Sequence, residues 1–103
     1  MATELYDTVT LKLQDGSEVV CRPLKIKYLR QFMKAFAKMT NEVRNDSEQA
    51  IDVLFECAVV AFAQFRPDIK PEDLEELLDL PTLYKAIEVG SGIKMTGDDE
   101  GND

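Results

Sequence analysis

Few residues in this sequence are of the types that carry out chemistry. The 103-residue chain contains no histidine, which removes the commonest general base and the commonest metal ligand. Ser17, Ser47 and Ser91 therefore have no histidine that would activate them as nucleophiles. Cys21 and Cys57 stand apart from each other and do not have the spacing of a zinc site. No glycine-rich loop follows a predicted strand, so no phosphate-binding loop is expected.

Groups of carboxylates are the remaining candidates for acid–base or metal chemistry. They occur at 72–73, 75–76 and 98–100, which are predicted to be a helix start, a solvated helix face and a tail. Carboxylates in such places are ordinarily solvated, and the tail lacks the alternating spacing of an EF-hand calcium loop. The sequence therefore predicts a protein that is not an enzyme and that holds no metal and no cofactor.

The cysteines and the lack of a targeting signal indicate the expected setting. Both thiols sit among apolar residues, and the chain has neither a signal peptide nor a run of roughly 20 apolar residues that would span a membrane. These features favour a reducing, intracellular setting in which Cys21 and Cys57 are buried. A disulfide between them is the less favoured alternative.

The formal net charge of -8 is concentrated in the last third of the chain. Nine acidic and nine basic residues balance each other through Arg66, whereas eleven acidic residues face three lysines from Pro67 onward. Nucleic acids and anionic lipids attract cationic surfaces, so this distribution argues against either as a partner. It also helps to keep a protein in solution when part of its surface is apolar.

The stretch from Glu48 to Phe65 is predicted to be the central helix. Apolar residues recur in it at helical spacing, and no charged residue occurs between Cys57 and Ala63. A helix that is apolar on nearly every side is usually buried on nearly every side. The main interpretation is a core helix, and a compatible second one leaves part of its apolar face to a partner's helix.

The other elements are predicted around this helix. Alternating apolar and polar residues on both sides of Asp15-Gly16 predict a β-hairpin over 6–22. Since a lone hairpin is marginal in water, its apolar face must pack on the helices. The predicted fold is α+β and mainly helical, with the N-terminal β-hairpin packed on about four helices. The expected parts are one domain over 1–95, helices at about 24–39, 47–65, 71–79 and 81–90, and a disordered acidic tail at 96–103.

Capping residues mark two of the helix boundaries. Residues 40–47 are predicted to be a loop in which Asn45, Asp46 or Ser47 caps the central helix. Gly90 and Gly92 are expected to end the last helix.

Two sets of residues are candidates for a binding surface. The first is soft and aromatic, which suits adaptation to irregular helical partners. It consists of Phe32, Met33, Phe36, Met39 and Phe62. The second is a basic stripe on the opposite side of the helix predicted at 24–39, made of Lys27, Arg30, Lys34 and Lys38. Core packing and an ordinary solvated face are the alternative explanations. As a binding surface, the stripe would meet an acidic surface such as 72–79, within the chain or between subunits.

The order of these parts resembles the tail assembly chaperones of long-tailed bacteriophages. The resemblance extends from about Tyr6 to Lys94 and is carried by the opening VTLKLQDGSEVVCRPLKIKYLRQFMKAF, by the segment FRPDIKPEDLEELLDLPTLYKAIEVGSGI and by the short acidic end. Its most specific portion is EDLEELLDLPTLYKAIEVGSGIK, an acidic short helix, Asp-Leu-Pro, and a helix ending in Gly-x-Gly-Ile.

The resemblance implies a non-catalytic function. Such proteins coat the long helical tape-measure protein, keep it soluble, and leave as the tail-tube protein polymerises around it. It implies that this chain works in the host cell cytoplasm and is absent from the mature virion. Many members also occur in a longer form made by a programmed frameshift, which would be a further partner, and a homo-oligomer is compatible with this function.

Two other functions remain open from the sequence. One is a small acidic inhibitor or regulator that mimics nucleic acid, which needs carboxylates spread over a rigid face. Many of the acids here fall instead in one short helix or in the predicted tail. The other is a structural tail or head-joining component, which would stay in the finished particle.

Overall fold

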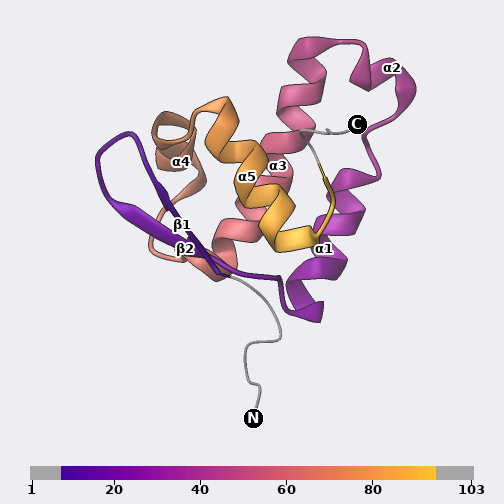
Figure 1. Cartoon of the computed structure of the whole chain (residues 1–103). Helices are drawn as coiled ribbons and strands as arrows, with labels where there is room; N and C mark the ends of the chain where they lie inside the picture. The colour runs from indigo at the N-terminus through magenta and orange to yellow at the C-terminus, as the bar shows by residue number, and fades with distance from the viewer. Residues whose placement is uncertain (1–7, 95–103) are drawn as a thin grey trace, which may run out of the picture.

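An antiparallel hairpin and five helices make up residues 8–94, the part of the chain that the computed structural model describes (Figure 1). The fold is α+β and mainly helical, as predicted. The elements are, in order, β1 (Val9–Lys12), β2 (Glu18–Cys21), α1 (Ile26–Phe36), α2 (Asn41–Arg44), α3 (Ser47–Phe65), α4 (Pro71–Leu77) and α5 (Leu80–Ser91). The prediction of a disordered tail over 96–103 falls outside the described residues.

Helix α3 is the central element. It has the predicted bounds, and it contacts each of the other four described helices and strand β2. Its first turn is capped by Asp46, whose Oδ1 accepts hydrogen bonds at 3.1 Å from the backbone N–H groups of Glu48 and Gln49. Asp46 is therefore the cap among the three candidates.

The buried side chains form two clusters on different sides of α3. One cluster joins α1, α3 and α5, and Phe32, Leu54 and Ile87 belong to it. The other lies under the hairpin and includes Val19 and Phe62. In Figure 1, α1 and α2 accordingly lie at one end of the molecule, the hairpin and α4 at the other, and α5 passes across α3 between them.

The hairpin packs on the helices, as predicted, because two strands alone are only marginally stable in water. Its inward side chains at Leu13, Val19 and Cys21 are buried, and β2 lies against α3 and α5. The predicted turn is formed by Asp15, whose carboxylate accepts from the N–H and the hydroxyl of Ser17, and by a glycine at φ +88°. Among residues 8–94, strand pairing covers 9–12 and 18–21 and stops before the predicted end of the hairpin at 22. Residues 6 and 7 of the predicted hairpin lie outside the described residues.

Tertiary hydrogen bonds shift the first helix boundary from its predicted place. The backbone N–H of Leu24 donates to the Gly90 carbonyl at 2.8 Å, and that of Lys25 donates to Gln64 Oε1 at 2.8 Å. These bonds hold the chain extended, so α1 begins at Ile26 rather than at 24. The helix also ends earlier than predicted, at Phe36 rather than at 39, because the backbone N–H groups of Lys38 and Met39 donate to carbonyls three residues back, in turns, rather than four residues back as in an α-helix. Within the predicted loop 40–47, four residues form the short helix α2.

Of the two glycines predicted to end the last helix, Gly92 does so and Gly90 does not. Gly92 has φ +81° and ends α5 in the left-handed conformation that glycine favours. Gly90 lies inside α5 instead, and it is buried against Leu24, whose Cγ would be 3.2 Å from an added Cβ. A close approach between two segments, rather than a helix end, explains this glycine.

Both cysteines are free and buried, as the main interpretation of the sequence predicts. Burial raises the pKa of the Cys21 and Cys57 thiols to about 12, so neither forms a thiolate at neutral pH. No helix among residues 8–94 is both long and apolar enough to cross a membrane.

Candidate partner-binding surface

Helix α1 has a wider apolar face than the core covers. Phe32 and Ala35 are buried and point toward α3, which α1 contacts most extensively. One edge of the apolar face turns away from that contact, where Ile26 is 64% exposed and Met33 is 47% exposed. Two half-buried residues lie along the same edge. We call Ile26, Leu29, Met33 and Phe36 the exposed strip, because they follow one another at helical spacing on one side of α1.

Two of the five predicted binding residues are core residues. Phe32 is 0% exposed and Phe62 is 2% exposed, so neither can touch a partner while the chain is folded as described. The Phe32 ring stacks on Phe36, with centroids 5.9 Å apart and an angle of 15° between the planes. Phe62 meets Phe65 edge to face at 5.8 Å. Core packing, the alternative explanation for this set, therefore holds for Phe32 and Phe62.

The other predicted residues lie at the surface. Met33 is exposed, and Phe36 and Met39 are half-buried. Phe36 and Met39 also line a hollow of about 540 Å³, which Leu54, Tyr84 and Ile93 line as well. We call this hollow the groove. It is built by α1, α3, α5 and the residues that follow α5, so it joins segments that are far apart in sequence.

Sequence reasoning missed several residues of this surface. Ile26, Tyr84 and Ile93 are not among the residues that the sequence singled out for binding, yet Ile26 belongs to the exposed strip and Tyr84 and Ile93 line the groove. Arg44 and Lys94 also line the groove, one from α2 and one from just beyond α5. Nothing in the local sequence signals these residues, because the groove exists only once α5 is placed beside α1 and α3.

The basic stripe is exposed along its whole length. Lys27, Arg30 and Lys34 lie on α1, and Lys38 lies just beyond its end. Lys38 Nζ is 2.9 Å from Glu56 Oε2 on α3, whereas among residues 8–94 the other three cations form no ion pair. Lys27 Nζ instead lies 5.3 Å from the centre of the Tyr28 ring.

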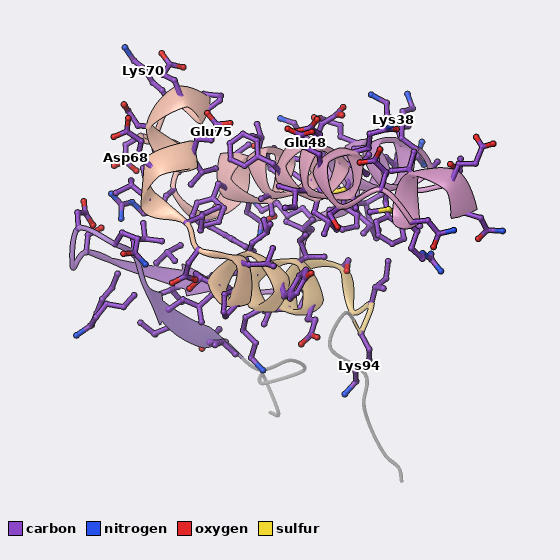
Figure 2. All side chains as sticks on the ribbon, turned by 90° about the horizontal axis from the view of Figure 1, so that it is seen from above. Lys38, Glu48, Asp68, Lys70, Glu75 and Lys94 are labelled. Carbon is purple, nitrogen blue, oxygen red and sulfur yellow. The ribbon has the colours of Figure 1, made fainter. Side chains whose placement is uncertain are left out.

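The acidic helix α4 does not contact this stripe. α1 and α4 are not among the packed pairs of described elements. Figure 2 shows the separation, with Asp68, Lys70 and Glu75 at one end of the molecule and Lys38 toward the other. An internal contact between the stripe and 72–79 is therefore wrong for residues 8–94, and a contact between subunits stays a prediction.

Several acids have structural partners instead. Arg66 donates to both carboxylate oxygens of Asp68, at 2.9 and 2.8 Å, and to the Glu18 carbonyl at 3.0 Å. The bonds to Asp68 lower the pKa of its carboxyl, and the bond to the Glu18 carbonyl ties the end of α3 to the hairpin. Asp79 caps α5, and hydrogen bonds from the Thr82 side chain and backbone lower its pKa. No group of three or more Cys, Asp or Glu side chains in the described part of the chain is arranged to hold a metal ion.

The surface thus combines an apolar strip, an apolar groove at its end and a row of cations beside it. Such a surface can bind a protein segment that is apolar on one side.

Among known proteins, no family model matches this chain, and neither a curated protein nor a solved structure is significantly similar to it.

Proposed function

We propose that this protein is a non-catalytic assembly chaperone that binds an apolar helical segment of a long client protein. By the resemblance described above, the client is the tape-measure protein of a long-tailed phage. On this proposal the chain works in the host cell cytoplasm, gives way to the tail-tube protein, and is absent from the mature virion. A longer frameshifted form would bind the same client.

The observation that carries the proposal is the exposed strip and its continuation into the groove. Ile26 and Met33 are large apolar side chains held at the surface of a well-packed helix, and Phe36 leads from them to Met39 in the groove. Single exposed apolar residues are ordinary, but a contiguous apolar surface is typical of an interaction site. Its elongated form along a helix suits another helix lying against it.

The charge distribution is consistent with a solubilising role. The net charge is -8, and α4 alone carries four acids while α1 carries none. A strong net charge placed away from the binding face keeps a complex with an aggregation-prone helix in solution. Methionine at the exposed position adapts to different apolar side chains, as binding to many sites along one client requires.

The test is co-expression with the proposed client, a long helical tape-measure protein, followed by measurement of the client in the soluble fraction. We expect the wild-type chain to carry the client into that fraction in many copies. The double variant Ile26→Ser and Met33→Ser should lose this ability while keeping its circular dichroism spectrum. The matched control is Val20→Thr with Leu80→Ser, which alters two exposed apolar residues on other elements and should leave solubilisation unchanged.

Two results would contradict the proposal. If the client remains insoluble with the wild-type chain present, the chaperone function has no support. If the chain is instead found in purified virions at a fixed copy number, it is a structural component of the particle.

A further inference from the structure

We infer that the client segment is an apolar helix with carboxylates along one flank, and that Lys27, Arg30 and Lys34 select and orient it. This inference rests on the proposed function and adds the chemistry of the partner. The surface that would bind the apolar side is the exposed strip, and the cations stand directly beside it.

The spacing on α1 places the cations next to the strip. Arg30 is four residues after Ile26 and three before Met33, so it is a neighbour of both on the helix surface. Lys27 and Lys34 lie one step further round and are seven residues apart, which corresponds to about 10.5 Å along the axis. A partner helix with acids seven residues apart has its carboxylates at the same interval.

Among residues 8–94, Lys27, Arg30 and Lys34 form no ion pair, so each can pair with a carboxylate of a partner. Helix α1 contains no acid, and among residues 8–94 only Lys38 of the stripe pairs with a carboxylate. Glu56, which pairs with Lys38, lies on α3 and does not reach along α1 to the others within the distance of an ion pair. At the far end of the strip, Arg44 and Lys94 line the groove, so positive charge accompanies the apolar surface there too.

The negative net charge does not oppose this assignment at short range. The acids of α4 belong to a helix that makes no contact with α1. Charges separated by more than a Debye length, about 8 Å at physiological ionic strength, are largely screened from one another. A partner's carboxylates therefore respond mainly to the nearby cations of α1.

Two occupants from this chain fit less well than a separate partner. Helix α4 is acidic, but Leu74 is buried and Leu77 and Leu78 are half-buried against the core, so its apolar side is already covered. The sequence of residues 96–103, TGDDEGND, supplies acids but no apolar side chain to cover the strip. A separate helix that is apolar on one side and acidic along a flank supplies both.

The test uses three synthetic helical peptides with the same leucine-rich face. Their flanking positions, seven residues apart, carry Glu, Gln or Lys, and binding to the full chain is measured by fluorescence anisotropy. We expect the Glu peptide to bind about three- to tenfold more tightly than the Gln peptide, because each exposed ion pair contributes only modestly to binding, and the Lys peptide to bind most weakly. The preference should shrink as salt is added, because exposed ion pairs are screened.

A charge-reversed chain makes the test specific to these residues. In the triple variant K27E, R30E and K34E, the preference should change to the Lys peptide. The control triple K12E, R22E and K85E has the same net charge, alters exposed residues elsewhere, and should keep the preference for Glu.

The outcomes separate this inference from the proposed function. If all three peptides bind equally and the Ile26→Ser, Met33→Ser variant binds none, the strip binds the client without charge selection and the inference fails alone. Absence of binding by every peptide also overturns it, and co-expression then decides the chaperone function by itself. Sedimentation of the free chain tests whether helix α4 of a second copy binds the strip. If the chain forms a homo-oligomer that the triple variant dissociates, the surface belongs to a contact between copies. Peptide binding seen only after deletion of 96–103 would assign it to the chain's own end.

Discussion

Phe32 and Met33 are neighbours in sequence whose replacement by alanine should have opposite consequences. Both belong to the set that the sequence singles out as a binding surface. The structure places the Phe32 side chain at 0% exposure in the cluster between α1, α3 and α5, and the Met33 side chain at 47% exposure on the exposed strip. Phe32→Ala should therefore reduce stability, and Met33→Ala should reduce client binding.

The magnitudes follow from the burial of each side chain. Removing a fully buried phenylalanine costs about 3–5 kcal/mol, because transfer energy is lost and a cavity is left. The stacking of Phe32 on Phe36 places this site toward the upper part of that range. For a domain of about 100 residues, each kcal/mol lowers the melting temperature by roughly 4–8 °C, so Phe32→Ala should melt about 15–40 °C below the wild type. A surface substitution such as Met33→Ala should change the free energy of unfolding by less than about 0.5 kcal/mol.

Urea and thermal unfolding followed by circular dichroism measure both effects, and solubilisation of the co-expressed client measures function. The two variants have the same replacement at adjacent positions, so each is the control for the other. The assignment of the strip would be refuted if Met33→Ala destabilised the fold by several kcal/mol, or if Phe32→Ala left the melting temperature unchanged.

Three further outcomes are expected. Hydrogen bonds from Thr82 hold the pKa of the Asp79 carboxyl below its ordinary value of 3.8. The stabilisation that they give is therefore present above pH 3.8 and is lost as the pH falls through the lowered pKa. Asp79→Asn should make the free energy of unfolding, measured in urea, less dependent on pH in that acidic range. Gly90→Ala should lower the free energy of unfolding by about 1–3 kcal/mol in the same assay, because the new Cβ would lie 3.2 Å from Leu24 Cγ. The hydrogen bond from the Leu24 N–H to the Gly90 carbonyl keeps the two segments from moving apart to relieve this contact. The two buried cysteines should resist a thiol-reactive chromogenic reagent in the native chain and react fully in denaturant, and rapid native reaction would contradict their burial.

Local signals were sufficient for the centre of the fold. The bounds of α3 were predicted correctly because helical periodicity and the candidate capping residues at 45–47 are encoded within a few positions. The hairpin could also be predicted from local sequence, because an Asp-Gly turn between two alternating segments indicates a hairpin whatever the rest of the chain does. The α+β class followed from these elements together.

The candidate site depended on information that periodicity does not contain. A helical pattern identifies the apolar side of α1, but the placement of α3 and α5 decides how much of that side is covered. Phe32 and Met33 are about 100° apart around the helix, enough for one to be core and the other surface. Gly90 shows the same limit, because a glycine near a helix end looks like a terminator until Leu24 is found against it.

The exposed strip also bears on how a chaperone of this kind releases its client. Leu29 and Phe36 already pack partly on the core, so a partner would cover only their remaining surface together with Ile26 and Met33. The strip and the groove together comprise eleven of the described residues, well short of the roughly 20–30 residues that each side of a specific, stable interface contributes. On the proposed function, each copy therefore binds weakly, and many copies along one long helix hold it through their number. Because each contact is weak, tail-tube subunits could displace the copies one at a time, and no step would require a tight complex to be broken at once.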